Sequence, residues 1–414
     1  DLIGMPAVKS EIEAALLSLT DFPGLSVFGV FQPGQKVGEA DIVLKVQEED
    51  KADFAVRLDN EGTQETGRFR GRFTFDWNNP TGSADRLTLT VQQATTPTNS
   101  DFGSVDYERY LGNGFRGGLF LTKNAFDVGG DFADRNISAS SATQGIYLDK
   151  QLIRSREQNL SARVGLTRKN SITEQDDLQI NEDNLTIVNL EFTYDSVDTR
   201  FSGLNFATLA FSRGFNDLFG AQSSSLRSET LPPAKQPSRR GGLPEENFAE
   251  GQFNKIFGSY SRLQTLTRHT SLLLRTEFQW SEDLLVPLEQ YSIGGPDNVR
   301  AYGPAADLFD QAAFASLEYI INAPFFADAP AFGNRTWGEL LQLSLFYDGA
   351  IGRNNEPLVI ESDEFVSFQG VGWQLRFNMP NQIESRLMMA WPVGARDPLN
   401  ERDPQVWADF TYRF

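Results

Sequence analysis

Two side chains much used in catalysis and metal binding, cysteine and histidine, are nearly missing from this chain. Cysteine is absent, and the single histidine, His269, lies in the polar connector Thr267–Thr270. A Ser-His-Asp hydrolase or a histidine-based metal site would have to be built around His269 alone. A histidine in a connector is more often simply solvated. We therefore predict no catalytic residue, no metal site and no bound cofactor.

Motifs for nucleotide or hydrolase chemistry give no better support. Residues 112–117 (GNGFRG) fit the pattern G-x-G-x-x-G. The following GLFLTKNAF alternates like a strand, so no helix N-terminus is available to hold a pyrophosphate. We interpret the motif as a turn between strands. No Walker A, H-E-x-x-H or G-x-S-x-G sequence is present, which argues against an ATP-driven pump or a familiar hydrolase.

An arginine and an aspartate are better candidates for a site. Arg300 lies in the turn-rich segment GGPDNVRAYGP, between Val299 and Tyr302, and Asp348 lies in LFYDGA. Turn residues explain the bend, but they do not explain a cation flanked by large apolar groups. The planar fork of an arginine can bind a carboxylate through two hydrogen bonds. Two simpler interpretations stay open: Arg300 is a solvated loop cation, and Asp348 merely lines a wet channel.

The segments that must position these residues alternate in polarity with a period of two. From Leu341 to Asp348, one face carries the leucines and Tyr347, and the other carries polar residues, Phe346 and Asp348. Charged residues lie opposite aromatic residues in many other segments, which suits a wet lumen and a lipid exterior. We count about 16 such segments from Asp53 to the C-terminus, separated by short turns and longer loops. The pattern predicts an all-β membrane protein with a 16-stranded antiparallel transmembrane β-barrel.

Composition agrees with a barrel and excludes other classes. The chain has 33 Phe, yet only 40% of its residues are hydrophobic. No apolar run approaches the ~18 residues of a membrane helix. The formal net charge of −19 argues against a nucleic-acid partner.

The last strand suggests how the barrel is recognised during assembly. In Pro404–Phe414, the aromatic residues Phe410, Tyr412 and Phe414 share one face with Val406 and Ala408. Rings near the end of a lipid-facing strand suit the membrane interface. A terminal aromatic residue also resembles the assembly signal of bacterial outer-membrane barrels. We predict that these three residues form that signal.

In such a barrel the leucine face of Leu341–Asp348 meets lipid, so Asp348 points into the lumen. We predict that residues 288–311 form a loop that folds back into the barrel. Arg300 would then meet Asp348, while Val299 and Tyr302 would pack against the inner wall. The longest loop, Ala221–Glu250, is predicted to be mobile, with the pair Arg239-Arg240 solvated.

Residues 1–52 differ from the rest of the chain. Apolar residues at helical spacing precede a break at Phe22-Pro23-Gly24. Two strand-like runs follow, Leu25–Phe31 and Asp41–Val46, joined by a turn at Pro33-Gly34. One helix and two strands are too little for a stable domain, so we interpret this region as the C-terminal part of one.

The motifs together resemble a known family. The segment AALLSLTDFPGLSVFGVFQPGQKVGEADIVLKV resembles the end of a periplasmic α+β POTRA domain of the two-partner secretion transporters (TpsB, type V secretion), the haemolysin and filamentous-haemagglutinin secretion family. The later segment LDNEGTQETGRFRGRFTFDWNNPTGSADRL, residues 58–87, resembles the first two strands of its barrel and the start of the third. SIGGPDNVRAYGP is similar to the loop with the Val-Arg-Gly-Tyr motif, and LFYDGA is similar to the aspartate strand motif. The resemblance covers nearly the whole chain and rests on these four separated motifs, which come in the right order.

The chain departs from the family pattern in two places. Ala301 occupies the position where glycine is usual, so the turn is expected to need no positive φ there, or to accept strain. After Asp348, glycine comes one place earlier than usual. The family also has an N-terminal plug helix, a linker and two complete POTRA domains, of which we expect only part of the second here.

The resemblance implies the function. A pore in the bacterial outer membrane, with residues 1–52 in the periplasm and residues 53–414 as the barrel, would secrete one large unfolded exoprotein. Implied partners are an exoprotein with an N-terminal secretion domain, outer-membrane lipids and the barrel-assembly machinery, around a monomeric pore. Two alternatives remain: a barrel-assembly insertase of the same superfamily, and a diffusion porin or outer-membrane enzyme such as a lipase.

Overall fold

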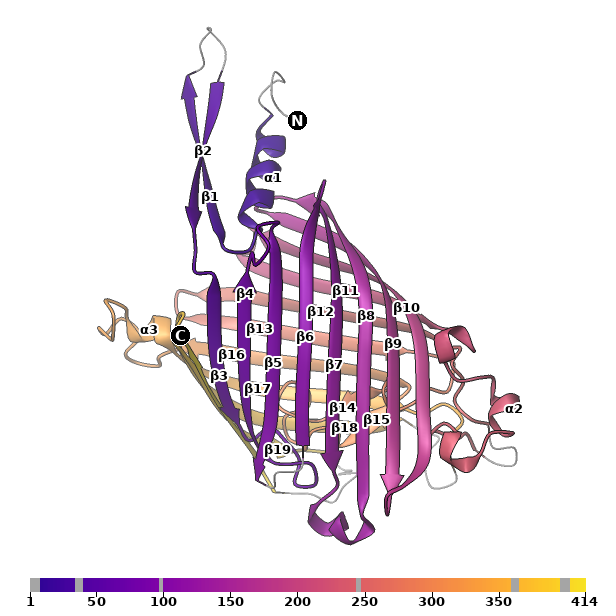
Figure 1. The fold of residues 1–414 in the computed structure, drawn as a ribbon. Helices are drawn as coiled ribbons and strands as arrows, with labels where there is room; N and C mark the ends of the chain where they lie inside the picture. The colour runs from indigo at the N-terminus through magenta and orange to yellow at the C-terminus, as the bar shows by residue number, and fades with distance from the viewer. Residues whose placement is uncertain (1–7, 34–39, 97–99, 243–246, 359–364, 395–402) are drawn as a thin grey trace.

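The structure is a computed structural model that describes residues 8–33, 40–96, 100–242, 247–358, 365–394 and 403–414. Sixteen strands hydrogen-bond in one closed antiparallel ring, which confirms the predicted barrel (Figure 1). In chain order they are β3 (Ala52–Asp59), β4 (Phe69–Asn78), β5 (Asp85–Thr96), β6 (Ser100–Gly112), β7 (Phe115–Asp127), β8 (Ile137–Arg154), β9 (Gln158–Gln175), β10 (Leu178–Asp198), β11 (Gly203–Gly214), β12 (Asn254–Thr267), β13 (Thr270–Trp280), β16 (Gln311–Asn322), β17 (Leu341–Arg353), β18 (Val366–Met379), β19 (Ile383–Pro392) and β20 (Gln405–Arg413).

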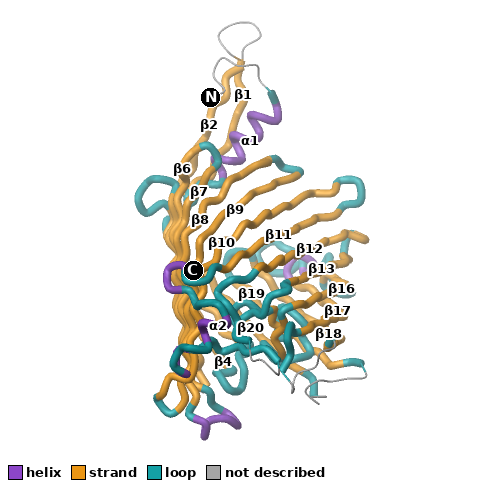
Figure 2. The backbone as a smooth tube through the Cα atoms, turned by 90° about the vertical axis from the view of Figure 1, so that its right-hand side faces the viewer, coloured by secondary structure: helices purple, strands orange, loops and turns teal. Residues whose placement is uncertain are grey.

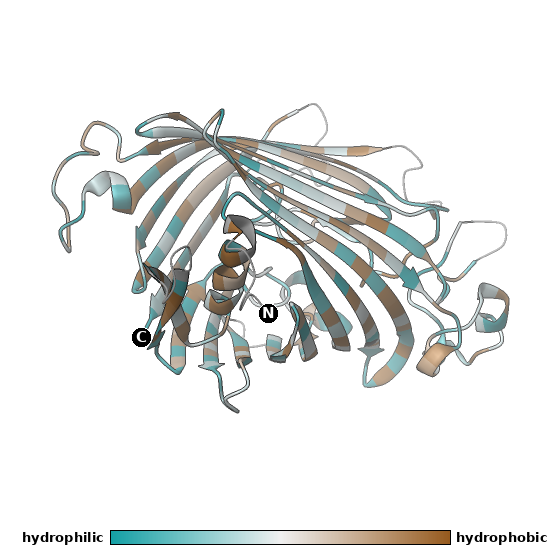
Figure 3. Cartoon of the chain, turned by 90° about the horizontal axis from the view of Figure 1, so that it is seen from above, coloured by the Kyte–Doolittle hydropathy of each residue, from teal (hydrophilic) through white to brown (hydrophobic). Residues whose placement is uncertain are grey.

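The barrel wall follows the alternation in the sequence. On β17, Leu345 and Tyr347 are exposed on the outside, whereas Ser344, Phe346 and Asp348 are buried on the inside. Figure 3 shows the same alternation as brown and teal bands along the strands. A shift of one residue in register would turn each apolar set into the lumen, so the two-residue period specifies the pairing.

Residues before β3 form a separate small unit. Helix α1 (Lys9–Thr20) packs beside the antiparallel hairpin of β1 (Leu25–Pro33) and β2 (Ala40–Glu48), as the sequence predicted. The predicted turn at Pro33-Gly34 extends into residues outside the described part of the chain. The unit stands beyond one end of the barrel (Figures 1 and 2), and we call that end the N-terminal rim.

The two ends of the barrel differ in their connections. At the N-terminal rim most turns are short: β6 and β7, for example, are joined by Asn113 and Gly114. Gly112, Asn113 and Gly114 have φ of 96°, 51° and 74°, which explains the glycines and agrees with the predicted turn. At the opposite end, the loop rim, long connections include residues 215–253 and 281–310. Connections at both ends of the barrel contain short helical elements. They are η1 (Gly130–Arg135), η2 (Leu218–Gly220), α2 (Ser225–Ser228), η3 (Pro233–Lys235) and α3 (Trp337–Leu340).

No helix within the described ranges is long and apolar enough to cross a membrane.

The ring closes through a short pairing between its first and last strands. Between β20 and β3 the register runs only from Asp409↔Asp59 to Arg413↔Ala55. The side chain of Asn60 extends it: its amide donates to the Val406 carbonyl at 2.9 Å, and its oxygen accepts from the Ala408 N–H at 2.7 Å. A side chain thus supplies hydrogen bonds that backbone pairing supplies elsewhere.

Candidate functional site

The connection between β13 and β16 lies inside the barrel. Its two ends pair as β14 (Tyr291–Ile293) with β15 (Asp307–Phe309), and the segment between them carries Arg300. Gly294 has φ of 99°, and a Cβ placed there would lie 2.2 Å from the Gly303 carbonyl oxygen. Glycine is therefore required at this turn, which directs the following residues to the wall.

Arg300 contacts two carboxylates at once. Its Nε and Nη2 atoms lie 2.9 and 2.8 Å from the two oxygens of Asp348, a bidentate arrangement. Its Nη1 lies 2.8 Å from Glu318, and its Nη2 donates to Ser316 at 3.1 Å. The guanidinium carbon lies 3.3 Å from the centre of the Phe346 ring. Stacking and a two-sided fork fix the arginine in position as well as in charge.

The wall positions these partners through strand register. Ser316 on β16 pairs with Asp348 on β17, and Glu318 pairs with Phe346, so the four side chains share one inward patch. The side chains of Arg300, Glu318 and Asp348 are 2, 6 and 0% exposed. Charges this deeply buried stay ionised only when they are paired and hydrogen-bonded. From the sequence we predicted Asp348 as a partner of Arg300, but not Ser316 and Glu318. Their inward positions could have been inferred, because the segment AFASLEYII alternates between outward and inward residues.

Apolar residues of the loop pack against the same wall. Val299 and Tyr302 are fully buried, and the Tyr302 ring meets Phe368 edge to face with a centroid distance of 5.1 Å. A Cβ at Gly370 would lie 2.5 Å from the Cβ of Ala301. The φ of Ala301 is not positive, so alanine needs no strain here, as expected. The absence of a side chain at Gly370 therefore leaves the space that Ala301 occupies against the wall.

The last strand also holds the loop, through a residue that the sequence did not single out. Trp407 on β20 is buried, and its indole N–H donates to the Arg300 carbonyl at 2.8 Å. Its inward parity opposite Val406 and Ala408 was visible in the sequence, but its partner was not. The loop therefore contacts β16, β17, β18 and β20.

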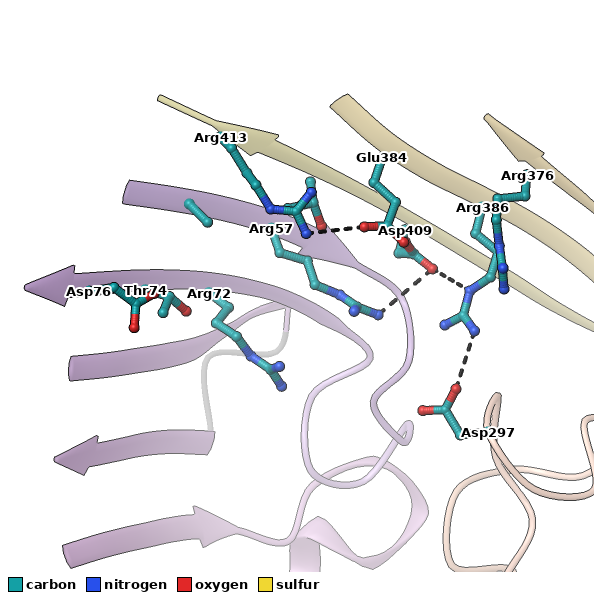
Figure 4. Close-up of a pocket in the computed structure, with 12 residues that line it drawn as sticks. Arg57, Arg72, Thr74, Asp76, Asp297, Arg376, Glu384, Arg386, Asp409 and Arg413 are labelled. Carbon is teal, nitrogen blue, oxygen red and sulfur yellow. Dashed lines mark hydrogen bonds and ion pairs between the residues drawn. The ribbon is translucent and has the colours of Figure 1, made fainter. Parts of the chain in front are cut away.

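A second cluster of charges lines the lumen where the barrel closes (Figure 4). Arg386 on β19 lies 2.7 Å from Asp409 on β20 and 3.2 Å from Asp297 of the inward loop. Arg386 also lies 2.7 Å from Glu61, which follows β3 and is not drawn in the figure. Arg57 on β3 lies 2.6 Å from Glu61. Burial raises the pKa of Glu61, although Arg57 and Arg386 oppose that shift. These contacts join three neighbouring strands to the loop.

Other contacts interlock the connections at the loop rim. Buried Asp310 accepts hydrogen bonds from Arg239, Leu285, Gln290 and Asn355 at 2.8–3.5 Å. Glu289 lies 2.6 Å from Lys169 and 2.5 Å from Lys255. The prediction that Arg239 is solvated was wrong: its guanidinium reaches into this cluster because Asp310 needs a counter-charge.

The remaining candidates lie apart from the inward loop. Phe410, Tyr412 and Phe414 are exposed on the outside of β20, and the Tyr412 and Phe414 rings lie 4.8 Å apart. His269 lies in the β12–β13 turn, 3.6 Å from an Asp328 oxygen. Within the described ranges, no three His, Asp or Glu side chains could together hold a metal ion.

These features define a class: a transmembrane β-barrel whose lumen is occupied by one of its own loops, held there by buried charge pairs. Residues 38–310 match the family model described as haemolysin secretion/activation protein ShlB/FhaC/HecB, and the chain belongs to that family. This is the TpsB family of two-partner secretion transporters, which are outer-membrane proteins and not enzymes. The family membership confirms the predicted resemblance.

Curated relatives and solved structures agree. The heme/hemopexin transporter protein HuxB of Haemophilus influenzae (strain 86-028NP) is 24% identical over 394 residues, 93% of this chain and 64% of the relative. The outer membrane transporter CdiB-2 of Burkholderia pseudomallei is 24% identical over 71% of this chain and 55% of the relative. The structure of CdiB from Escherichia coli has a TM-score of 0.75 at 18% identity, with 94% of this chain and 67% of that chain covered. The chain thus spans roughly two thirds or less of these relatives.

Proposed function

We propose that this protein is the translocation pore of a two-partner secretion system. It would pass one large exoprotein outward across the outer membrane in an unfolded state. The observation that carries the proposal is the inward loop, which lies in the lumen and is held to the wall by side chains, while its own strands β14 and β15 pair with each other. Such a loop can leave without opening the ring of strands.

The relatives support this assignment. HuxB is named as a heme/hemopexin transporter, and CdiB-2 as an outer membrane transporter. A secreted partner exoprotein with an N-terminal secretion domain is the substrate class that the family implies. Outer-membrane lipids surround the barrel, and the barrel-assembly machinery would insert it, with Phe410, Tyr412 and Phe414 as its signal. We propose that one chain forms one pore.

The N-terminal unit has the helix–hairpin order of the end of a POTRA domain, and we assign residues 1–52 to it and residues 53–414 to the barrel. The N-terminal rim then faces the periplasm. Capture of an extended exoprotein segment would use strand addition, in which main-chain hydrogen bonds give affinity and side-chain pockets give selectivity. Folding of the exoprotein outside would supply the net driving force.

In this proposal Arg300 and Asp348 lock residues 288–311 to the barrel, and Val299 and Tyr302 complete the contact. The test is secretion of a candidate partner, an exoprotein with an N-terminal secretion domain, measured in the medium of cells that carry both proteins. Arg300→Ala should reduce release because the loop loses its defined position. Arg268→Ala is the matched control, since Arg268 is a rim arginine that is 80% exposed and pairs with exposed Asp328.

The same cells separate the alternatives. A barrel-assembly insertase predicts that depletion of the protein lowers other outer-membrane barrels while exoprotein release is indirect. A diffusion porin predicts a steady open conductance in planar bilayers. Normal exoprotein release in cells that lack this protein would refute the proposal.

A further inference from the structure

The connection between β16 and β17 differs from the other turns at the N-terminal rim. Residues 323–340 form a compact tongue in place of a short turn, and Figures 1 and 3 show it extending sideways from the barrel. A β-bridge between Pro330 and Thr336 closes the tongue. The backbone N–H of Trp337 donates to the Ala329 carbonyl at 3.0 Å. The tongue is therefore ordered by its own hydrogen bonds.

The tongue exposes aromatic side chains that the protein itself leaves uncovered. Phe325 is fully exposed, and Phe326 and Phe332 are 43 and 56% exposed. Phe326 and Phe332 both meet the half-buried Trp337 edge on, with centroid distances of 6.0 and 5.6 Å. Exposed apolar groups gathered in one place mark an interaction surface.

The ring of Phe325 points outward from a residue whose backbone conformation is unfavourable. Phe325 has φ of 73°, a left-handed conformation that is unfavourable for a bulky residue. Such a conformation is strained and persists only where the surrounding structure fixes it. The tongue thus holds the Phe325 ring away from the rest of the chain, where the ring is available to a partner outside the protein.

The level of the tongue identifies what covers it. On β17 the outward apolar residues run from Leu341 to Ile351, which at about 3.3 Å per residue and a tilt near 40° corresponds to the ~25 Å apolar band of an outer-membrane barrel. Leu341 directly follows the tongue, so the tongue begins where the apolar band ends. Phenylalanine and tryptophan at that level belong to the lipid interface.

We propose that the tongue is a membrane-surface anchor: Phe325, Phe326, Phe332 and Trp337 insert into the phospholipid headgroup region beside the N-terminal rim. These four side chains, anchored on one side of the barrel, would fix the depth and tilt of β16 and β17 in the membrane. Both strands carry partners of Arg300. The anchor depends on the barrel lying in a membrane and not on secretion.

The absence of cysteine makes the test direct, because a single introduced cysteine can be labelled specifically. Phe325→Cys carries a nitroxide in phospholipid nanodiscs, and its collision rates with oxygen and with a water-soluble nickel chelate are compared. Thr81→Cys, exposed in the β4–β5 turn at the same rim, is the matched control. We expect the label at 325 to collide several-fold more with oxygen than with the chelate, and the label at 81 to show the reverse.

A second measurement removes the dependence on the label. Bromine-substituted phospholipids should quench part of the tryptophan fluorescence, and that part should be smaller in Trp337→Phe. Equal chelate access at 325 and 81, together with unchanged quenching in Trp337→Phe, would overturn the anchor. Protection at 325 only after an exoprotein segment is added would assign the surface to the exoprotein and also overturn it.

Discussion

At the scale of single residues, Arg300 is the point where the inward loop is held most firmly. Its guanidinium meets Asp348 through two atoms and Glu318 through a third, and its backbone carbonyl accepts from Trp407. Removal of one partner of a buried ion pair costs roughly 3–5 kcal/mol, because the other charge stays buried and unpaired. Loss of one carboxylate should destabilise the protein less than loss of the arginine, because the second carboxylate still neutralises Arg300.

The first prediction follows from that asymmetry. Arg300→Ala should destabilise the loop more than Asp348→Ala or Glu318→Ala, because it leaves two carboxylates facing each other. The defects of Arg300→Ala and Asp348→Ala should not add: a coupling of about 0.5–3 kcal/mol is expected for residues in contact. Urea unfolding in detergent and single-channel conductance measure the two effects.

Arg300→Lys is the informative companion variant. A lysine keeps the charge but cannot bridge two carboxylates with a planar fork, so the channel should open more often than the wild type. Strictly additive defects of Arg300→Ala and Asp348→Ala, or a lysine variant that behaves as the wild type, would contradict the assignment of a lock.

At the scale of elements, the last strand has two roles on its two faces. Inward, Trp407 contacts the loop, and outward, Phe414 ends the aromatic stripe. The Phe414 N–H donates to the Phe54 carbonyl at 2.9 Å, so it also extends the short closure between β20 and β3.

We predict that deletion of Phe414 lowers the amount of assembled barrel. The deletion removes an interfacial ring and a closing hydrogen bond together. Heat-modifiable migration in gels measures the assembled fraction. Phe414→Tyr keeps both features and should assemble normally; if the deletion also assembles normally, the residue has neither role.

The loop rim is expected to respond to pH through Asp310. Burial raises the pKa of this carboxyl, although Arg239 opposes the shift. A raised pKa in the folded state means that the stabilising contribution is complete below the ordinary value of 3.8 and is lost as pH rises through the folded value. Burial would raise the pKa of Glu289 too, but Lys255 and Lys169 outweigh burial and lower it, so Glu289 stays charged in this range.

The third prediction is therefore that the rim loops loosen as pH rises from about 4 toward neutrality. Protease cleavage within residues 215–253 should become faster over that range. Asp310→Asn keeps the shape without the charge and should flatten the profile. A wild-type profile that slopes the other way would exclude Asp310 as its cause.

Elements were more predictable from the sequence than the contacts between them. Two-residue alternation specified the strands and placed Asp348 inside, because each inward position is set by local parity. The partners Glu318 and Trp407 were not predicted, since register between strands and the path of a loop depend on contacts distant in sequence. The prediction for Arg239 was wrong for the same reason. An arginine in a polar loop is expected to be solvated, and only the structure shows that the buried carboxylate of Asp310 lies beside it.

At the scale of the whole molecule, the N-terminal unit is fixed to the barrel by few contacts. Arg154 on β8 meets both oxygens of Asp21 at 2.5 and 2.9 Å, and Arg116 on β7 donates to the Asp21 carbonyl at 3.2 Å. Phe22 packs on Tyr110 with a centroid distance of 4.8 Å. If an exoprotein is captured by this unit and passed to the lumen, its orientation to the pore depends on this contact.

The last prediction is that Arg154→Ala loosens the N-terminal unit and leaves the barrel intact. Arg154 and Asp21 are 23 and 26% exposed, and a partly exposed ion pair contributes only about 0–1 kcal/mol. Arg154→Ala alone should therefore broaden the range of orientations of the N-terminal unit, and its combination with Phe22→Ala should free the unit from the barrel. Spin labels on Ala15→Cys and Thr81→Cys report the distance distribution between the unit and the barrel. Arg268→Ala is the matched control, since Arg268 is a rim arginine that is 80% exposed and pairs with Asp328, which lies outside the N-terminal unit. A narrow distribution in the double variant would mean that other contacts orient the unit, and normal secretion despite a broad one would mean that orientation does not matter for transfer.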